Sequence, residues 1–279
     1  MIRLLADLPQ PGYPADYLLA RLPARRPRWR KAPTAGGEGW PVLARESRWL
    51  YGQLPQRLRR ELAPLFLYFE LRPLFLFLRG LAAGRCAPAD ELLAATLLAD
   101  DLKRTLLRAR EAGEALRVLA SWWPGGAGLE RLAAAKGLAA VEQVMTGALF
   151  REAARSATVL RPLWAALIDL ENVVALAKRL RWQVASPFGY RPGGFTAQRR
   201  FLGAEQNRVP EMAALVVAPL RAAAQQGNWS LEGVLVGRVE RQLGTAATTA
   251  PAVTVAAYLW GAYAATRRLA LAQAAEASQ

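Results

Sequence analysis

The chain of 279 residues contains no histidine, a single cysteine, Cys86, and only three methionines. Without histidine there is no imidazole to act as a general base near neutral pH, and none to ligate a metal ion. One cysteine can form neither an intramolecular disulfide nor a cysteine pair for zinc, so a reducing compartment is permitted. These absences exclude the commonest catalytic and metal-binding sets of side chains.

Motifs for phosphate chemistry are also missing. None of the four lysines follows a glycine in the spacing of the loop Gly-x4-Gly-Lys-Ser/Thr, so ATP hydrolysis by this chain is not expected. The acidic pairs Asp90-Glu91 and Asp100-Asp101 are typical of helix starts and exposed faces, where acids cap and solubilise. No sequence neighbour activates the thiol of Cys86. The sequence therefore predicts a protein that is not an enzyme and has no cofactor or metal site.

Basic residues outnumber acidic ones, with 37 against 22 and a formal net charge of +15. Such a chain favours anionic surroundings, and the candidate partners are nucleic acid, an acidic membrane surface and acidic protein subunits. Six basic residues crowd one segment: Arg21, Arg25, Arg26, Arg28, Arg30 and Lys31. This segment is either a solvated end of an element or a patch that faces an anionic partner. Pro23 and Pro27 argue against a long undisturbed helix there.

Apolar residues make up 53% of the chain, and their spacing is helical rather than alternating. We expect an all-α protein that forms a single domain over residues 1–279. An irregular lead-in at 1–14 precedes the predicted helices. These cover 41–54, 55–80, 88–99, 100–122 with a break at Gly113, 129–157 with a break near Gly137, 161–182, a segment from Thr196 as N-cap, 210–225, 230–243 and 251–275.

Residues 242–266 carry no charged side chain and are long enough to cross a bilayer. The stretch is rich in Ala and Thr, poor in Leu, Ile and Phe, and interrupted by Pro251, a favoured first-turn residue of helices. We therefore expect a loop that ends near Ala250 and a buried helix from Pro251, rather than a membrane span. No signal peptide is expected, because Met1–Leu8 contains an acid and Pro9 follows.

The most informative stretch, residues 161–182, reads RPLWAALIDLENVVALAKRLRW. Five of its apolar residues fall near one stripe of a helix: Leu163, Leu167, Leu170, Val174 and Leu180. Asp169 and Asn172 lie three residues apart, so they are neighbours on the surface of that helix. Because asparagine is a poor helix former, Asn172 is either solvated beside Asp169 or part of a polar clamp to a neighbouring helix.

The string IDLENVVALAKRL, followed after a loop by RPGGFTAQRRFL, resembles the signature of the V/A-type ATPase subunit called C in prokaryotes and d in eukaryotes. That family has an Asp-Leu-x-Asn helix that ends in Leu-Arg-Ala-Lys, and then a Pro-Gly-Gly loop before another helix. The matching residues here are Asp169, Leu170, Asn172, Val173, Lys178, Pro192, Gly193 and Gly194.

An incomplete internal repeat accompanies this signature. Glu70-Leu71, followed by Arg79, repeats the spacing of Asp169-Leu170 and Lys178, and Pro73 stands where the family has Asn. Asp101-Leu102 with Arg110 fits the same frame. In a chain so rich in Arg and Leu, chance is the alternative explanation.

The resemblance implies a pseudo-threefold arrangement of helical bundles that form a funnel. It implies a non-catalytic coupling subunit that links the central stalk to the membrane proteolipid rotor ring, for proton or sodium transport. Such a subunit lies on the cytoplasmic face of the membrane in a bacterial or archaeal cell, any lipid contact is peripheral, and no specific nucleic acid is expected.

The alternative is a basic all-α nucleic-acid-binding protein. Trp29, Trp49 and Trp182 are interleaved with arginines and would stack on bases in such a protein. A cation that sits over an indole ring explains the same Trp-Arg pairing without any nucleic acid.

Overall fold

The computed structural model describes residues 2–30, 39–84, 87–156, 158–182, 190–207 and 250–276, together with 236–237, 239–240 and 243. Over these residues the chain is helical and has no β-strand, apart from an isolated antiparallel bridge between Leu5 and Leu98. The expected all-α class is confirmed. Backbone contacts divide the chain into two compact units, Met1–Arg25 with Trp40–Ala157 and Arg26–Gly39 with Thr158–Gln279.

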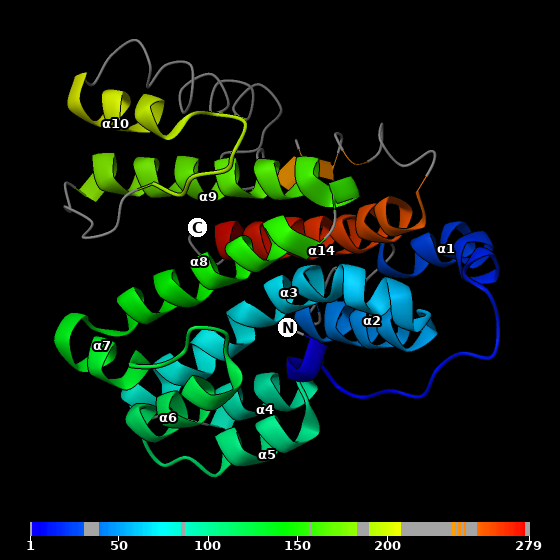
Figure 1. The fold of residues 1–279 in the computed structure, drawn as a ribbon, viewed down its shortest axis with the longest axis horizontal. Coiled ribbons are helices and arrows are strands. Elements are labelled where there is room, and N and C mark those ends of the chain that lie inside the picture. The colour runs from blue at the N-terminus through cyan, green and yellow to red at the C-terminus, as the bar shows by residue number, and fades with distance from the viewer. Residues whose placement is uncertain are drawn as a thin grey trace. The chain divides into compact units, whose positions relative to one another are not determined.

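The first unit is built on α3 (Gln56–Ala82), a helix of 27 residues that buries apolar side chains along its whole length. The other elements of this part of the chain are η1 (Ile2–Leu4), α1 (Ala15–Arg30), α2 (Gly39–Gln53), α4 (Ala87–Ala95), α5 (Asp100–Leu107), α6 (Ala112–Trp122), α7 (Leu129–Lys136) and α8 (Leu138–Ser156). α3 packs against η1, α4, α6 and α8, so it forms the centre of the unit (Figure 1).

α1 runs without interruption for 16 residues, through Pro23 and Pro27. The prediction that these prolines would prevent a long helix is therefore wrong. A proline removes one backbone hydrogen bond and bends a helix, but the helix continues where packing holds the next turn. Leu18 and Leu22 supply that packing in α1, because both side chains are fully buried.

The irregular lead-in is held in place by Arg59 of α3, whose side chain is buried. Its guanidinium donates to the carbonyl oxygens of Leu8 at 2.5 Å and Pro9 at 2.6 Å in the lead-in. It also donates to the carbonyl oxygen of Tyr51 at 3.0 Å, near the end of α2. A further bond of 3.2 Å joins it to the carbonyl oxygen of Gly52. Buried carbonyl groups need donors, and one cation here serves four of them.

The predicted break at Gly137 is confirmed, because α7 ends at Lys136 and α8 begins at Leu138. The break predicted at Gly113 lies earlier, between α5 and α6, over residues 108–111. The backbone N–H of Arg110 donates to Oε2 of Glu114 at 2.9 Å, so an acid in the first turn of α6 binds the connection just before the helix. Gly113 lies inside α6, and the boundary does not fall at the glycine.

The second unit contains η2 (Thr158–Leu160), α9 (Arg161–Trp182), α10 (Gln198–Asn207) and α14 (Pro251–Glu276). α9 has the bounds that the sequence predicts, and Leu163 and Leu167 of its apolar stripe are buried. Residues 190–197 lead into α10, which lies along α9 (Figure 1). The helix expected at 210–225 and most of that expected at 230–243 lie outside the described residues.

α14 begins at Pro251, as predicted, and buries Tyr258 and Leu259. The indole N–H of Trp260 donates to the carbonyl oxygen of Val236 at 3.0 Å, so the polar edge of this buried ring is satisfied. Within the described part of the chain, no helix has the length and apolar character that a membrane crossing requires.

Candidate functional site

Asn172 lies in the middle of α9 with only 2% of its surface exposed. Its Nδ2 donates to the carbonyl oxygen of Arg191 at 2.9 Å, and its Oδ1 accepts from the backbone N–H of Arg191 at 2.7 Å. The side-chain amide therefore pairs with both backbone groups of one residue, as a neighbouring strand would. Solvation of Asn172 is excluded, and a polar clamp at this residue is confirmed.

Asp169, one turn earlier on α9, binds the far end of the same loop. Both of its carboxylate oxygens lie 3.1 Å from the backbone nitrogen of Thr196, and Oδ2 accepts from the Thr196 hydroxyl at 3.1 Å as well. The predicted partner needs a correction, because the clamp holds a loop and not a neighbouring helix. Since residues three apart project from the same side of a helix, one face of α9 holds the loop at two points.

The two glycines between these points meet different requirements. A Cβ atom at Gly194 would overlap with Oδ1 of Asp169 and lie 3.0 Å from its Cγ, so no side chain fits there while the carboxylate keeps its place. Gly193 has a φ of +98°, which residues with side chains rarely adopt. The Gly-Gly sequence is thus matched to the acid on α9.

Tyr190 and its neighbours connect this loop to the helices on both sides. The buried ring of Tyr190 stacks on that of Phe201 in α10 with centroids 5.2 Å apart. The guanidinium of Arg179 in α9 lies 4.7 Å from the centroid of the Tyr190 ring, a cation–π contact. The side-chain amide of Gln198 in α10 donates to the carbonyl oxygen of Tyr190. Both helices therefore contribute to the position of the loop.

The other residues of the family signature lie around the clamp or outside the described residues. Leu170 is buried, and Pro192 is exposed at the start of the glycine pair. Lys178 belongs to α9, but its side chain lies outside the described residues. Thr196 is not the N-cap that the sequence predicts, because α10 begins at Gln198 and the Thr196 hydroxyl donates to the α9 carboxylate.

We expect Asn172→Leu to lower the free energy of unfolding by about 1 to 3 kcal/mol, because leucine has a similar shape but leaves both backbone groups of Arg191 without their partner. Chemical denaturation of the purified protein measures this change. Arg161→Leu, at an exposed position of the same helix, is the matched control and should change stability by less than about 0.5 kcal/mol. Equal stability of the two variants would contradict a role for the clamp in the fold.

Gly194→Ala should also destabilise the protein, by roughly 1 to 3 kcal/mol, because the new methyl group displaces the Asp169 carboxylate from Thr196. Gly12→Ala serves as the control, since no heavy atom lies within 4 Å of a Cβ at that position. Thermal unfolding of both variants is the measurement. If Gly194→Ala melts with the wild type, the close approach of Gly194 to Asp169 is not part of the folded protein.

The basic segment near the N-terminus forms part of α1, and two of its cations have partners. Arg25 pairs with Glu46 of α2 through contacts of 2.5 Å and 3.1 Å, and its guanidinium lies 3.7 Å from the centroid of the Trp49 ring. Arg21 lies near the rings of Tyr17 and Trp49, at 5.4 Å and 5.8 Å. The prediction that a cation covers an indole is confirmed for Trp49.

These contacts reduce the number of basic residues that the predicted anion-facing patch can offer to a partner. Arg25 is neutralised locally by its carboxylate partner, so it does not add a full charge to a docking surface. Arg26 is exposed. The side chains of Arg28 and Arg30, and the whole of Lys31, lie outside the described residues.

The incomplete repeat in α3 places a buried acid at the position that corresponds to Asp169. Glu70 is 5% exposed, and the backbone N–H of Leu97, 27 residues further along the chain, acts to lower the pKa of its carboxyl group. Asp169 and its partner Thr196 are separated by the same 27 residues. The same sequence separation therefore relates each acid to a backbone N–H of a later connection.

The other positions of the repeat match less well. Pro73 follows Glu70 by three residues, as Asn172 follows Asp169, but proline has no amide side chain for a second clamp. Asp101, the third acid that fits the frame, is exposed and pairs with Arg104 on its own helix. Its contact is an ordinary surface ion pair of neighbouring turns.

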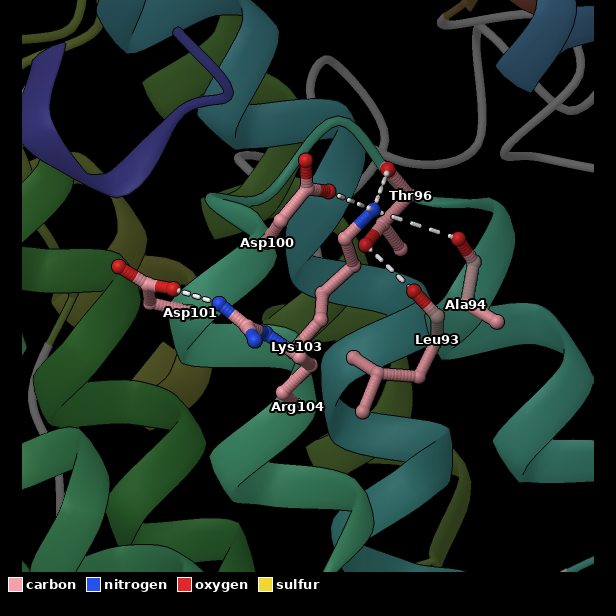
Figure 2. A network of polar contacts seen from close by, with 7 residues as sticks. All are labelled: Leu93, Ala94, Thr96, Asp100, Asp101, Lys103 and Arg104. Atoms are coloured by element: carbon pink, nitrogen blue, oxygen red, sulfur yellow. Dashed lines mark hydrogen bonds and ion pairs between the residues drawn. The ribbon is translucent and has the colours of Figure 1, made fainter.

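Near Glu70, a network of polar contacts joins the end of α4 to the start of α5. Figure 2 shows this network. The buried Lys103 places Nζ 2.9 Å from Oδ1 of Asp100, and donates to the carbonyl oxygens of Thr96 at 3.3 Å and Ala94 at 3.4 Å. The hydrogen bond from Lys103 and its charge lower the pKa of Asp100. One lysine thus satisfies carbonyl groups that the end of α4 leaves open.

Burial raises the pKa of Glu70 from 4.5 to about 7, although the Leu97 N–H and the charge of Lys103 act in the opposite direction. Between pH 4.5 and about pH 7, Glu70 keeps its proton in the folded state and loses it in the unfolded state. Stability should therefore fall as pH rises through this range, by roughly 3 kcal/mol in all, and level off above about pH 7.

Glu70→Gln should remove this slope, because glutamine keeps the shape of the side chain and does not titrate. Denaturation curves at several pH values between 4.5 and 8 measure it, and a chain without histidine has few other groups that titrate there. Glu91→Gln, at an exposed position of α4, is the control. Parallel pH profiles for wild type and Glu70→Gln would show that Glu70 is charged throughout.

Sequence analysis missed the partners of the clamp, since backbone groups of Arg191 and Thr196 carry no signal of their own. The Gly-Gly pair that follows Arg191 was the available signal, because it marks a close approach of backbone to another group.

Comparison with protein-family models gives no match, and comparison with curated proteins gives none either.

Proposed function

We propose that this chain is a non-catalytic coupling subunit of a rotary V/A-type ATPase. In this role it links the central stalk to the proteolipid rotor ring, on the cytoplasmic face of the membrane. The observation that supports the proposal best is the clamp itself. The family signature consists of two separate segments, and chance matches would have no reason to meet. Here Asp169 and Asn172 hold the loop that contains Gly193 and Gly194.

The proposal includes a pseudo-threefold arrangement of similar helical bundles around a funnel. The shared separation of 27 residues in Glu70–Leu97 and Asp169–Thr196 supports a repeated unit in which an acid on a long helix lies near a backbone N–H of a later connection. Asp101 does not add a third instance of this contact.

A coupling subunit passes torque between two partners, so it must resist deformation. Close-packed helices transmit strain with little change in shape, and clamped loops remove the softest connections between them. The net charge of +15 favours acidic partner surfaces, among them stalk subunits. Exposed Arg26 of α1 is available for such a contact.

Affinity purification of the tagged full chain from its own cells tests the proposal. We expect recovery of rotor-ring and central-stalk subunits, with or without nuclease, since the contacts are between proteins. Gly194→Ala should reduce this recovery at a temperature where circular dichroism shows it folded, and Gly12→Ala should not.

Recovery of nucleic acid without these subunits would overturn the proposal in favour of a basic nucleic-acid-binding protein. Loss of all partners on nuclease treatment would have the same meaning.

A further inference from the structure

The first unit contains a cavity of about 360 Å³ between α2, α3 and α4. Its walls are mainly apolar, with Leu43 from α2, Phe69 and Leu76 from α3, and Leu92 from α4. Pockets that bind small molecules span roughly 300 to 1,000 Å³ and have walls of this kind, so the cavity is of ligand size.

Ser47 of α2 lines this cavity, is 2% exposed, and has a hydroxyl without a hydrogen-bond partner among the described residues. Buried hydroxyl groups are normally satisfied, and an unsatisfied one is a cost to the fold. Glu70 of α3 also lines this cavity. Ser47 can both donate and accept, and a rotation about its χ1 bond reorients the hydroxyl without any change in the backbone.

The repeat explains why space remains here. Asn172 fills its position in α9 by pairing with Arg191, 19 residues later. Pro73 has the corresponding place in α3, Leu92 follows it by the same 19 residues, and both line the cavity. Neither side chain can form the hydrogen bonds of the clamp. The cavity therefore lies where α3 lacks a counterpart of the hydrogen bonds between Asn172 and Arg191.

The exposed charged groups at the cavity do not select an ion. The guanidinium of Arg72 lies 4.4 Å from the centroid of the Trp40 ring, and Glu91 supplies an opposite charge; all three residues line the cavity, and the two charged ones are exposed. A cation and an anion at one opening cancel much of each other's field. Recognition therefore falls to the apolar walls and the buried hydroxyl.

We propose that this cavity binds a small neutral molecule with an apolar ring or short chain and one hydroxyl group, which Ser47 recognises by a hydrogen bond. The apolar part replaces the packing that Pro73 and Leu92 leave incomplete. The hydroxyl group supplies the partner that Ser47 lacks. This inference stands independently of the proposed function, because the cavity and the Ser47 hydroxyl both belong to the first unit and are described without reference to any partner protein.

Titration calorimetry with 4-propylphenol and propylbenzene tests it, since these probes differ by one hydroxyl group. The wild type should bind the phenol about fivefold more tightly than propylbenzene, as one added hydrogen bond predicts. Ser47→Ala should abolish this preference and leave the affinity for propylbenzene unchanged. Ala95→Trp should fill the cavity from an exposed position of α4 and abolish binding of both probes.

Ala94→Trp is the matched control for Ala95→Trp, because Ala94 is also exposed on the same helix but does not line the cavity. It should bind both probes as the wild type does. The proposal is overturned if the wild type binds neither probe, or if Ala95→Trp binds them normally. Self-association of the wild type that Ala95→Trp abolishes would also overturn it, because the occupant would then be an apolar side chain of a second copy.

Discussion

The structure depends on one constraint. The backbone N–H and C=O groups of irregular segments beside long helices need hydrogen-bond partners, and no helix or strand of their own supplies them. At three places in the described residues a polar side chain on a helix supplies the partner. Asn172 and Asp169 do so for the loop before α10, and Arg59 does so for the N-terminal lead-in. Lys103 does so around the connection between α4 and α5. Polar residues inside these helices are therefore structural, and their spacing fixes where loops lie.

The same constraint links the fold to the proposed role in torque transmission. Helices are stiff by themselves, and the weak points of a helical body are its connections. A loop held at two points from one helix face has little freedom to move. The copy in α3 keeps the acid but has Pro73 in place of the amide, and the ligand-sized cavity lies at that point.

Sequence alone predicted the features that depend on local periodicity. The bounds of α9, the start of α14 at Pro251 and the all-α class follow from helical spacing and first-turn preferences. Features that depend on distant partners could not be predicted. The loop partners of Asn172, the pairing of Arg25 with Glu46 and the uninterrupted α1 are set by packing that arises only in the folded chain. The identity of Asp169 and Asn172 as a pair was predictable, but not what they hold.

Hydrogen exchange of the backbone amides of Arg191 and Thr196 tests the central claim most directly. Both residues precede α10 and belong to no helix, so without side-chain partners their amides would exchange quickly. The account predicts protection of both amides comparable to that of amides inside α9, because Asn172 and Asp169 accept from them. Exchange of these two amides at the rate of an unstructured peptide would contradict it.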